Sequence, residues 1–169
     1  MAGAEIIAEP KNSVDRRTLM RGAAWALPVV ALAVATPAAA ASDIDLGAYS
    51  LVGTCGILGV QGPGFTLTAG PGGIPVGTTI IVVGSGVANI GVFSTTGGTA
   101  STAVLSGTSR QITITGALAA GATMAFRTTL SITVPWTLNA TSTLPLGYVA
   151  TGAKTSASVT STQTLCSAT

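Results

Sequence analysis

Few residues of this chain could carry out acid–base or nucleophilic chemistry. The sequence holds no histidine, and no aspartate or glutamate follows Asp45. A serine or cysteine nucleophile needs a base that accepts its proton, which a chain without histidine does not readily supply. Hydrolysis of a glycosidic bond needs two carboxyl groups about 5–10 Å apart, and after residue 41 only Asp43 and Asp45 could supply them. These two residues lie next to the signal-peptide cleavage site predicted below. New chain ends are usually mobile, so a rigid catalytic site is not expected there, and we predict that the protein is not an enzyme.

The same inventory argues against a bound metal or cofactor. Zinc takes four nitrogen or sulfur ligands, and two cysteines without histidine do not fill them. Calcium takes six to eight oxygen ligands, more than two neighbouring aspartates provide. The stretch TIIVVGSGVAN is similar to the start of a dinucleotide-binding turn at Gly84 and Gly86, but Asn89 replaces the third glycine and no acidic residue follows for the ribose. We interpret this stretch as a hairpin turn and expect no cofactor.

Basic residues are concentrated near the start of the chain, where four of the seven lie within eleven positions: Lys11, Arg16, Arg17 and Arg21. An uncharged run, residues 22–42, follows directly. A basic segment, an apolar segment and small residues in an Ala-x-Ala pattern are the three parts of a secretory signal peptide. We therefore predict a signal peptide over residues 1–41, with Ala39 and Ala41 in the cleavage motif and the cut within one or two residues of Ala41.

The basic part contains the sequence DRRTLMR, and the residues that define its pattern are Arg16, Arg17, Leu19 and Met20. This sequence resembles the twin-arginine export signal, in which a polar residue precedes an arginine pair and two apolar residues follow one residue later. The resemblance implies a bacterial protein that is exported in the folded state through the twin-arginine translocase and is then cleaved by signal peptidase.

The apolar run is also long enough for a transmembrane helix, since about 20 residues span a bilayer. Pro28 and Pro37 interrupt this run, however, and its alanine-rich composition is only weakly hydrophobic. We therefore predict a cleaved signal rather than a permanent membrane anchor. No basic cluster follows Arg21, and the net charge is only +2, which argues against nucleic acid as a partner.

After residue 41 the sequence pattern is typical of β-strands. In TMAFRTTLSITV one parity, with Thr128 as its single polar member, holds the apolar residues Met124, Phe126, Leu130, Ile132 and Val134. Arg127 lies on the other, polar parity, and period two over eleven residues predicts one strand with a buried and an exposed face. Shorter runs with similar alternation, separated by glycine- and proline-rich turns, lie at residues 65–69, 78–83, 110–115 and 156–165. We therefore predict an all-β sandwich over residues 42–169, preceded by an N-terminal signal helix.

Three short segments share one pattern, in which apolar and small residues are followed by a glycine and then by a predicted strand. They are IPVGTTI, LAAGATM and LPLGYV. They resemble the strand-entry turns of bacterial immunoglobulin-like domains, which occur in secreted and cell-surface proteins. The resemblance implies an immunoglobulin-like sandwich of about seven or more strands with a role in adhesion, spacing or wall attachment. The bridge of antibody domains is not expected, because Cys55 and Cys166 lie too far apart in sequence and Trp136 lies too late between them.

Cys55 and Cys166 are the two cysteines of the chain, an even number that indicates one disulfide in an exported protein. Cys55 falls at the end of the first predicted strand, and Cys166 ends the last alternating run. In many sandwiches the first and last strands are neighbours and the chain ends lie close together. We therefore predict that Cys55 and Cys166 pair with each other.

Six aromatic residues follow residue 41. Phe65 and Phe126 fall on core-parity positions, whereas Trp136 and Tyr148 could either pack in the core or stack on a ligand such as a sugar ring. We predict a secreted, non-enzymatic protein with a structural or binding role at the cell surface and with a cell-wall or protein partner. The alternative is a carbohydrate- or cell-wall-binding module that uses Trp136 and Tyr148.

Overall fold

The computed structural model describes residues 42–57 and 60–169. The predicted signal helix lies outside the described residues, as do the remaining residues predicted for export and cleavage: Arg16, Arg17, Leu19, Met20, Ala39 and Ala41. Residues 42–169 form a compact unit. The described part of this unit is all-β, and within it no helix is long and apolar enough to cross a membrane.

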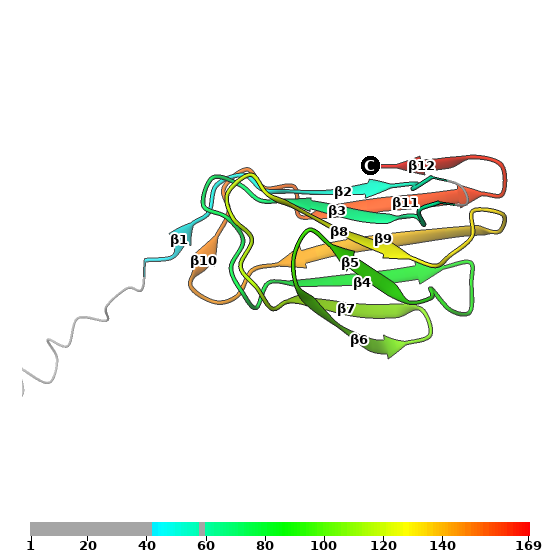
Figure 1. Ribbon diagram of the computed structural model, residues 1–169, viewed down its shortest axis with the longest axis horizontal. Helices are drawn as coiled ribbons and strands as arrows, with labels where there is room; N and C mark the ends of the chain where they lie inside the picture. Colours follow the sequence, from blue (N-terminus) through cyan, green and yellow to red (C-terminus); the bar gives the residue numbers. More distant parts are fainter. Residues whose placement is uncertain (1–41, 58–59) are drawn as a thin grey trace, which may run out of the picture. The chain divides into compact units, whose positions relative to one another are not determined.

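Two larger sheets and one small sheet make up the part of the chain that the structure describes (Figure 1). The six-stranded sheet is antiparallel and has the order β12-β11-β9-β4-β7-β6. Its strands, in chain order, are β4 (Thr79–Ser85), β6 (Ala100–Ser106), β7 (Ser109–Ile114), β9 (Pro135–Thr143), β11 (Ser156–Thr162) and β12 (Cys166–Ala168).

The four-stranded sheet is also antiparallel and has the order β2-β3-β8-β5. Its strands are β2 (Ser50–Thr54), β3 (Gly64–Thr68), β5 (Phe93–Thr96) and β8 (Thr123–Thr128). A parallel pair, β1 (Ile44–Asp45) and β10 (Tyr148–Val149), lies at one end of the domain (Figure 1).

Both larger sheets contribute their buried faces to one hydrophobic cluster, as in a β-sandwich. The predicted parity is confirmed on the six-stranded sheet, where four alternating residues are fully buried: Ile80, Val82, Ile112 and Ile114. On the four-stranded sheet, Phe65 and Phe126 are partners on neighbouring strands and are also fully buried. Burial of each such side chain contributes about 1.5–3 kcal/mol, so this shared core is the main source of stability.

The strand predicted over residues 124–134 is only half as long as expected. β8 ends at Thr128, and the chain then crosses from the four-stranded to the six-stranded sheet before β9 begins. Leu130 and Ile132 still pack against the core from this crossing, whereas Val134 is exposed. The alternation of apolar residues therefore continues through a loop that covers the end of the core.

The stretch TIIVVGSGVAN, which is similar to the start of a dinucleotide-binding turn, contains β4 and the residues that follow it. Gly86, directly after this strand, has a φ of 83°, which glycine adopts without strain. No helix follows, and the chain crosses to β5 in the other sheet instead of returning beside β4. The turn is therefore a crossing between sheets, and the predicted hairpin is wrong.

Candidate functional site at the disulfide end of the domain

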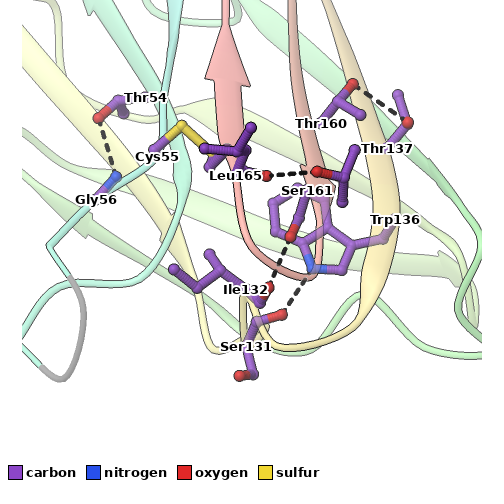
Figure 2. Close-up of a disulfide and its surroundings, with 12 residues drawn as sticks. Thr54, Cys55, Gly56, Ser131, Ile132, Trp136, Thr137, Thr160, Ser161 and Leu165 are labelled. Atoms are coloured by element: carbon purple, nitrogen blue, oxygen red, sulfur yellow. Dashed lines mark hydrogen bonds between the residues drawn. A yellow bond between two sulfur atoms is a disulfide. The ribbon is translucent and has the colours of Figure 1, made fainter.

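Cys55 and Cys166 form a disulfide, with their Cα atoms 5.8 Å apart and a sequence separation of 111 residues (Figure 2). The predicted pairing is confirmed, but Cys166 does not end the preceding strand. β11 stops at Thr162, Gln163 adopts a φ of 74°, and Cys166 opens the separate strand β12. The disulfide thus joins the segment after β2 to the last strand of the chain.

Backbone contacts link the two sheets beside the disulfide. The N–H of Gly53 in β2 donates a hydrogen bond of 2.7 Å to the carbonyl of Thr169. A Cβ at position 53 would lie 2.3 Å from the carbonyl oxygen of Ser158 in β11, so the backbones approach too closely for any residue but glycine. β2 and the β11–β12 pair therefore close one side of the sandwich.

The loop between β8 and β9 packs against the same end of the domain. Trp136 is 2% exposed, and its indole N–H donates a hydrogen bond of 2.7 Å to the carbonyl of Ser131 (Figure 2). The hydroxyl of Ser161 donates one of 2.8 Å to the carbonyl of Ile132. Of the two positions left open for Trp136, the core and a ligand site, the structure shows the core.

Tyr148 lies far from Trp136. It is partly exposed in β10, opposite Ile44 of β1, at the end of the domain remote from the start of β9 (Figure 1). The structure therefore does not bring the two aromatic residues predicted for ligand stacking into one site.

Asp45 is held in place more firmly than a residue near a chain end was expected to be. Its carboxylate accepts hydrogen bonds from the N–H groups of Gly47, at 2.9 Å, and Thr151, at 3.0 Å. Hydrogen bonding from Thr151, and then from Gly47, lowers the pKa of this carboxyl group. Within residues 42–57 and 60–169, no group of three or more histidine, cysteine, aspartate or glutamate residues lies together as a metal site would require.

A pocket of about 420 Å³ lies beside the disulfide, between the described parts of the β2–β3 loop (residues 55–57 and 60–63) and the β8–β9 loop. Five apolar residues contribute to its wall: Ile57, Val60, Pro63, Leu130 and Ile132. Arg127 supplies the charged group of the lining, and Ser94 and Thr96 of β5 supply hydroxyl groups. Sequence reasoning identified none of these residues as a site, because the pocket forms only where two loops distant in sequence meet.

Arg127 lies on the outer face of the four-stranded sheet, as its parity predicts, between Gly64 of β3 and Ser94 of β5. Its Nε and Nη1 atoms are buried, and neither has a hydrogen-bond partner within the described part of the chain. Burial also lowers the pKa of its guanidinium group. Arg127 is therefore a partly buried cation with two buried donor atoms, Nε and Nη1, that have no partner in the described part of the chain.

Arg110 has a very different environment. It is 5% exposed, and its Nη1 atom donates hydrogen bonds to the carbonyls of Ser106, Gly107 and Ser109. Its Nη2 atom donates a bond of 2.9 Å to Oδ1 of Asn89. Arg110 therefore ties the β6–β7 turn to the segment after β4, and it is a structural residue.

β6 forms an open edge of the six-stranded sheet, since within the described residues it pairs with β7 alone. All its residues except Ala100 are exposed, including Val104 at 70% and Leu105 at 55%. The apolar residues of β6 do not alternate, so periodicity does not predict this strand. The two-residue link Gly107–Thr108 to the predicted strand β7 is the hairpin signal that indicates it.

No family model, curated protein or solved structure matches this chain.

Proposed function

We propose that this chain is a secreted bacterial protein that acts at the cell surface or in the extracellular space by association rather than by catalysis. In this proposal the β-sandwich is immunoglobulin-like, and residues 1–41 direct export through the twin-arginine route. The disulfide supports an extracellular location, because such bonds persist in oxidising compartments and are rare in the cytoplasm. The charged side chains after residue 41, which include no histidine or glutamate, support a role without acid–base chemistry.

The observation that carries the associative function is the open edge of β6. An edge strand presents unpaired N–H and C=O groups to which a further strand can bind. Natural proteins usually block such edges with charges, with proline or by keeping the strand very short. β6 is seven residues long, has neither a charged residue nor proline, and exposes Val104 and Leu105. Its register with β7 shifts only between Val104 and Ser106, next to the turn, so the strand is regular from Ala100 to Val104.

The partner that we propose for this edge is β6 of a second copy of the same chain. Two uncharged strands do not repel each other, and antiparallel pairing about a twofold axis satisfies the same donors and acceptors in both copies. Such a pair also brings Val104 and Leu105 of each copy next to the other strand, which removes apolar surface from water.

The test is the oligomeric state of the purified protein, measured by light scattering over a range of concentrations. We expect reversible self-association that Ala103→Lys in β6 abolishes, because a lysine on an edge strand opposes pairing. The control is Thr141→Lys, which places the same charge on an exposed position of β9, a strand with neighbours on both sides. A protein that stays monomeric at every concentration, or a lysine at position 103 without effect, would contradict the proposal.

The alternative function, a carbohydrate- or cell-wall-binding module, loses support from the structure. It relied on two aromatic rings, and one of them, Trp136, lies in the core. Of the two rings, only that of Tyr148 is partly exposed, and it lies in β10, at the end of the domain remote from the start of β9 (Figure 1).

A further inference from the structure

We propose that the pocket beside the disulfide binds a small carboxylate with an aliphatic group, and that Arg127 is its counter-ion. This site is separate from the β6 edge, so the proposal goes beyond self-association and does not depend on it. It rests on three features of the pocket: an unsatisfied cation, an open space next to that cation, and an apolar wall.

The first feature is the guanidinium group of Arg127. A buried polar group without a hydrogen-bond partner is unfavourable, and a charged one more so. Arg110 shows how the same domain satisfies an arginine that has a purely structural role. The acidic residues after residue 41 are Asp43 and Asp45, at β1, which lies at the end of the domain remote from the start of β9 (Figure 1). The Asp45 carboxylate is also engaged with Gly47 and Thr151. The domain therefore offers Arg127 no counter-ion, and a bound anion would supply it.

The second feature is the absence of large side chains around Arg127 on its own sheet. Its partner on β3 is Gly64, where a Cβ would lie 2.0 Å from the carbonyl oxygen of Phe126. At Gly62 a Cβ would lie 1.9 Å from the carbonyl oxygen of Thr128. On the other side, Ser94 is small, and its hydroxyl lies 3.4 Å from the carbonyl of Arg127. Backbone packing thus requires glycine at positions 62 and 64, so neither residue carries a side chain that could cover the guanidinium group of Arg127.

The third feature defines the ligand class. A guanidinium group forms charge-assisted hydrogen bonds with a carboxylate, and one cation balances one negative charge. A phosphate dianion would keep one charge without a partner. Ile57 and Val60, which are 61% and 82% exposed, present apolar surface at the pocket that an aliphatic group would cover. The volume of about 420 Å³ lies within the usual range for small-molecule sites.

The experiment is a calorimetric or NMR titration of the purified protein with hexanoate, with neutral hexanamide of the same shape, and with inorganic phosphate. We expect saturable binding of hexanoate and binding of hexanamide that is at least about tenfold weaker, the size of one charge-assisted hydrogen bond. Acetyl-leucine and its amide form a second pair, which distinguishes the end of a peptide from a free fatty acid as the source of the carboxylate.

Arg127→Gln should weaken hexanoate binding to the level of hexanamide, and Arg127→Lys, which keeps the charge without the planar fork, should have an intermediate effect. The matched control is Lys154→Gln, which removes the same charge from an exposed side chain outside the pocket lining and should change nothing. Equal binding of hexanoate and hexanamide, or tighter binding of phosphate, would overturn the proposal. So would the absence of binding. The comparison of ligands on the unmodified protein decides the question even if Arg127→Gln does not fold.

Discussion

The hydroxyl of Tyr49 and the hydroxyl of Ser142 lie 2.9 Å apart in the interior, although 93 positions separate them in sequence. Ser142, in β9, also donates a hydrogen bond of 3.0 Å to the carbonyl of Thr155. Tyr49 directly precedes β2 of the other sheet. A chain of polar contacts thus joins the two sheets within an otherwise apolar core.

This relationship predicts the effect of Tyr49→Phe. The change removes one buried hydroxyl and should lower the free energy of unfolding by about 1 kcal/mol, as for a typical hydrogen bond. Urea unfolding of the two proteins measures the difference. Tyr148→Phe is the control, because Tyr148 is partly exposed, and it should be neutral. Equal losses for the two variants would show that the contact with Ser142 has no specific role.

Removal of the disulfide should weaken the domain without preventing its folding. For a loop of about 100 residues the chain-entropy model gives about 4.7 kcal/mol, which is an upper value. We expect the Cys55→Ser, Cys166→Ser double variant to be exported and to melt at a lower temperature, since the twin-arginine route requires folding in the reducing cytoplasm first. Thermal melting and thiol titration of the secreted protein test this. Two free thiols in the unmodified secreted protein would be the contrary result.

Burial of Trp136 has a spectroscopic consequence. The chain has two tryptophans, Trp25 in the predicted signal peptide and Trp136, so the cleaved protein should report on Trp136 alone. We expect the fluorescence of Trp136 to be blue-shifted and only weakly quenched by a soluble quencher. Added glycans should leave this fluorescence unchanged. Emission typical of a solvated indole would contradict the core position of this ring.

The carboxyl group of Asp45 predicts a modest dependence of stability on pH. Hydrogen bonds from Thr151 and Gly47 hold its pKa in the folded protein below its ordinary value. The stabilisation is therefore complete above that ordinary value and is lost as the pH falls through the lower, folded pKa. We expect Asp45→Asn to be less stable than the unmodified protein at neutral pH and the difference to vanish in acid. A difference independent of pH would show that the charge has no part in it.

Export should depend on the arginine pair. Changing Arg16 and Arg17 together to lysine keeps the charge but removes the guanidinium groups. We expect the full-length precursor to accumulate in the cells and the mature form to disappear from outside, both visible in an immunoblot of cell fractions. Normal secretion of the double variant would refute the twin-arginine assignment. Mass measurement of the secreted protein should place its first residue within two positions of Ser42.

Periodicity predicted several strands that have a buried and an exposed face, but it missed β9, whose burial alternates just as regularly. The buried positions of β9 include the small Ala140 and the polar Ser142, so its sequence lacks a continuous apolar parity. Ile80 and Ile112 are buried as predicted, because each strand lies between the core and solvent. β6 was missed because it has no covered face, and the end of β8 was missed because Leu130 and Ile132 remain against the core after the ladder of hydrogen bonds has stopped. Side-chain alternation reports burial, whereas strand pairing depends on the backbone.

The pocket could not be predicted for a related reason. The polar parity of Arg127 correctly indicated the outer face of its sheet. Its partial burial arises from loops outside its own strand, and those loops meet only in the folded chain. The disulfide was predictable because two cysteines in an exported chain have a single intramolecular pairing, which requires no knowledge of the loops.

The bond between Cys55 and Cys166 makes the chain between them a covalent ring that contains nine of the twelve strands found in the described residues, β3 to β11. Tension applied between Ser42 and Thr169 would pass from β2 through the two sulfur atoms into β12 and bypass the ring. Even if both ends were pulled until β2 and β12 detached, the rest of the domain could not unravel. A protease cut within the ring would likewise release no fragment. A load applied to the two ends of such a domain can therefore detach its terminal strands, but it cannot extend the strands inside the ring.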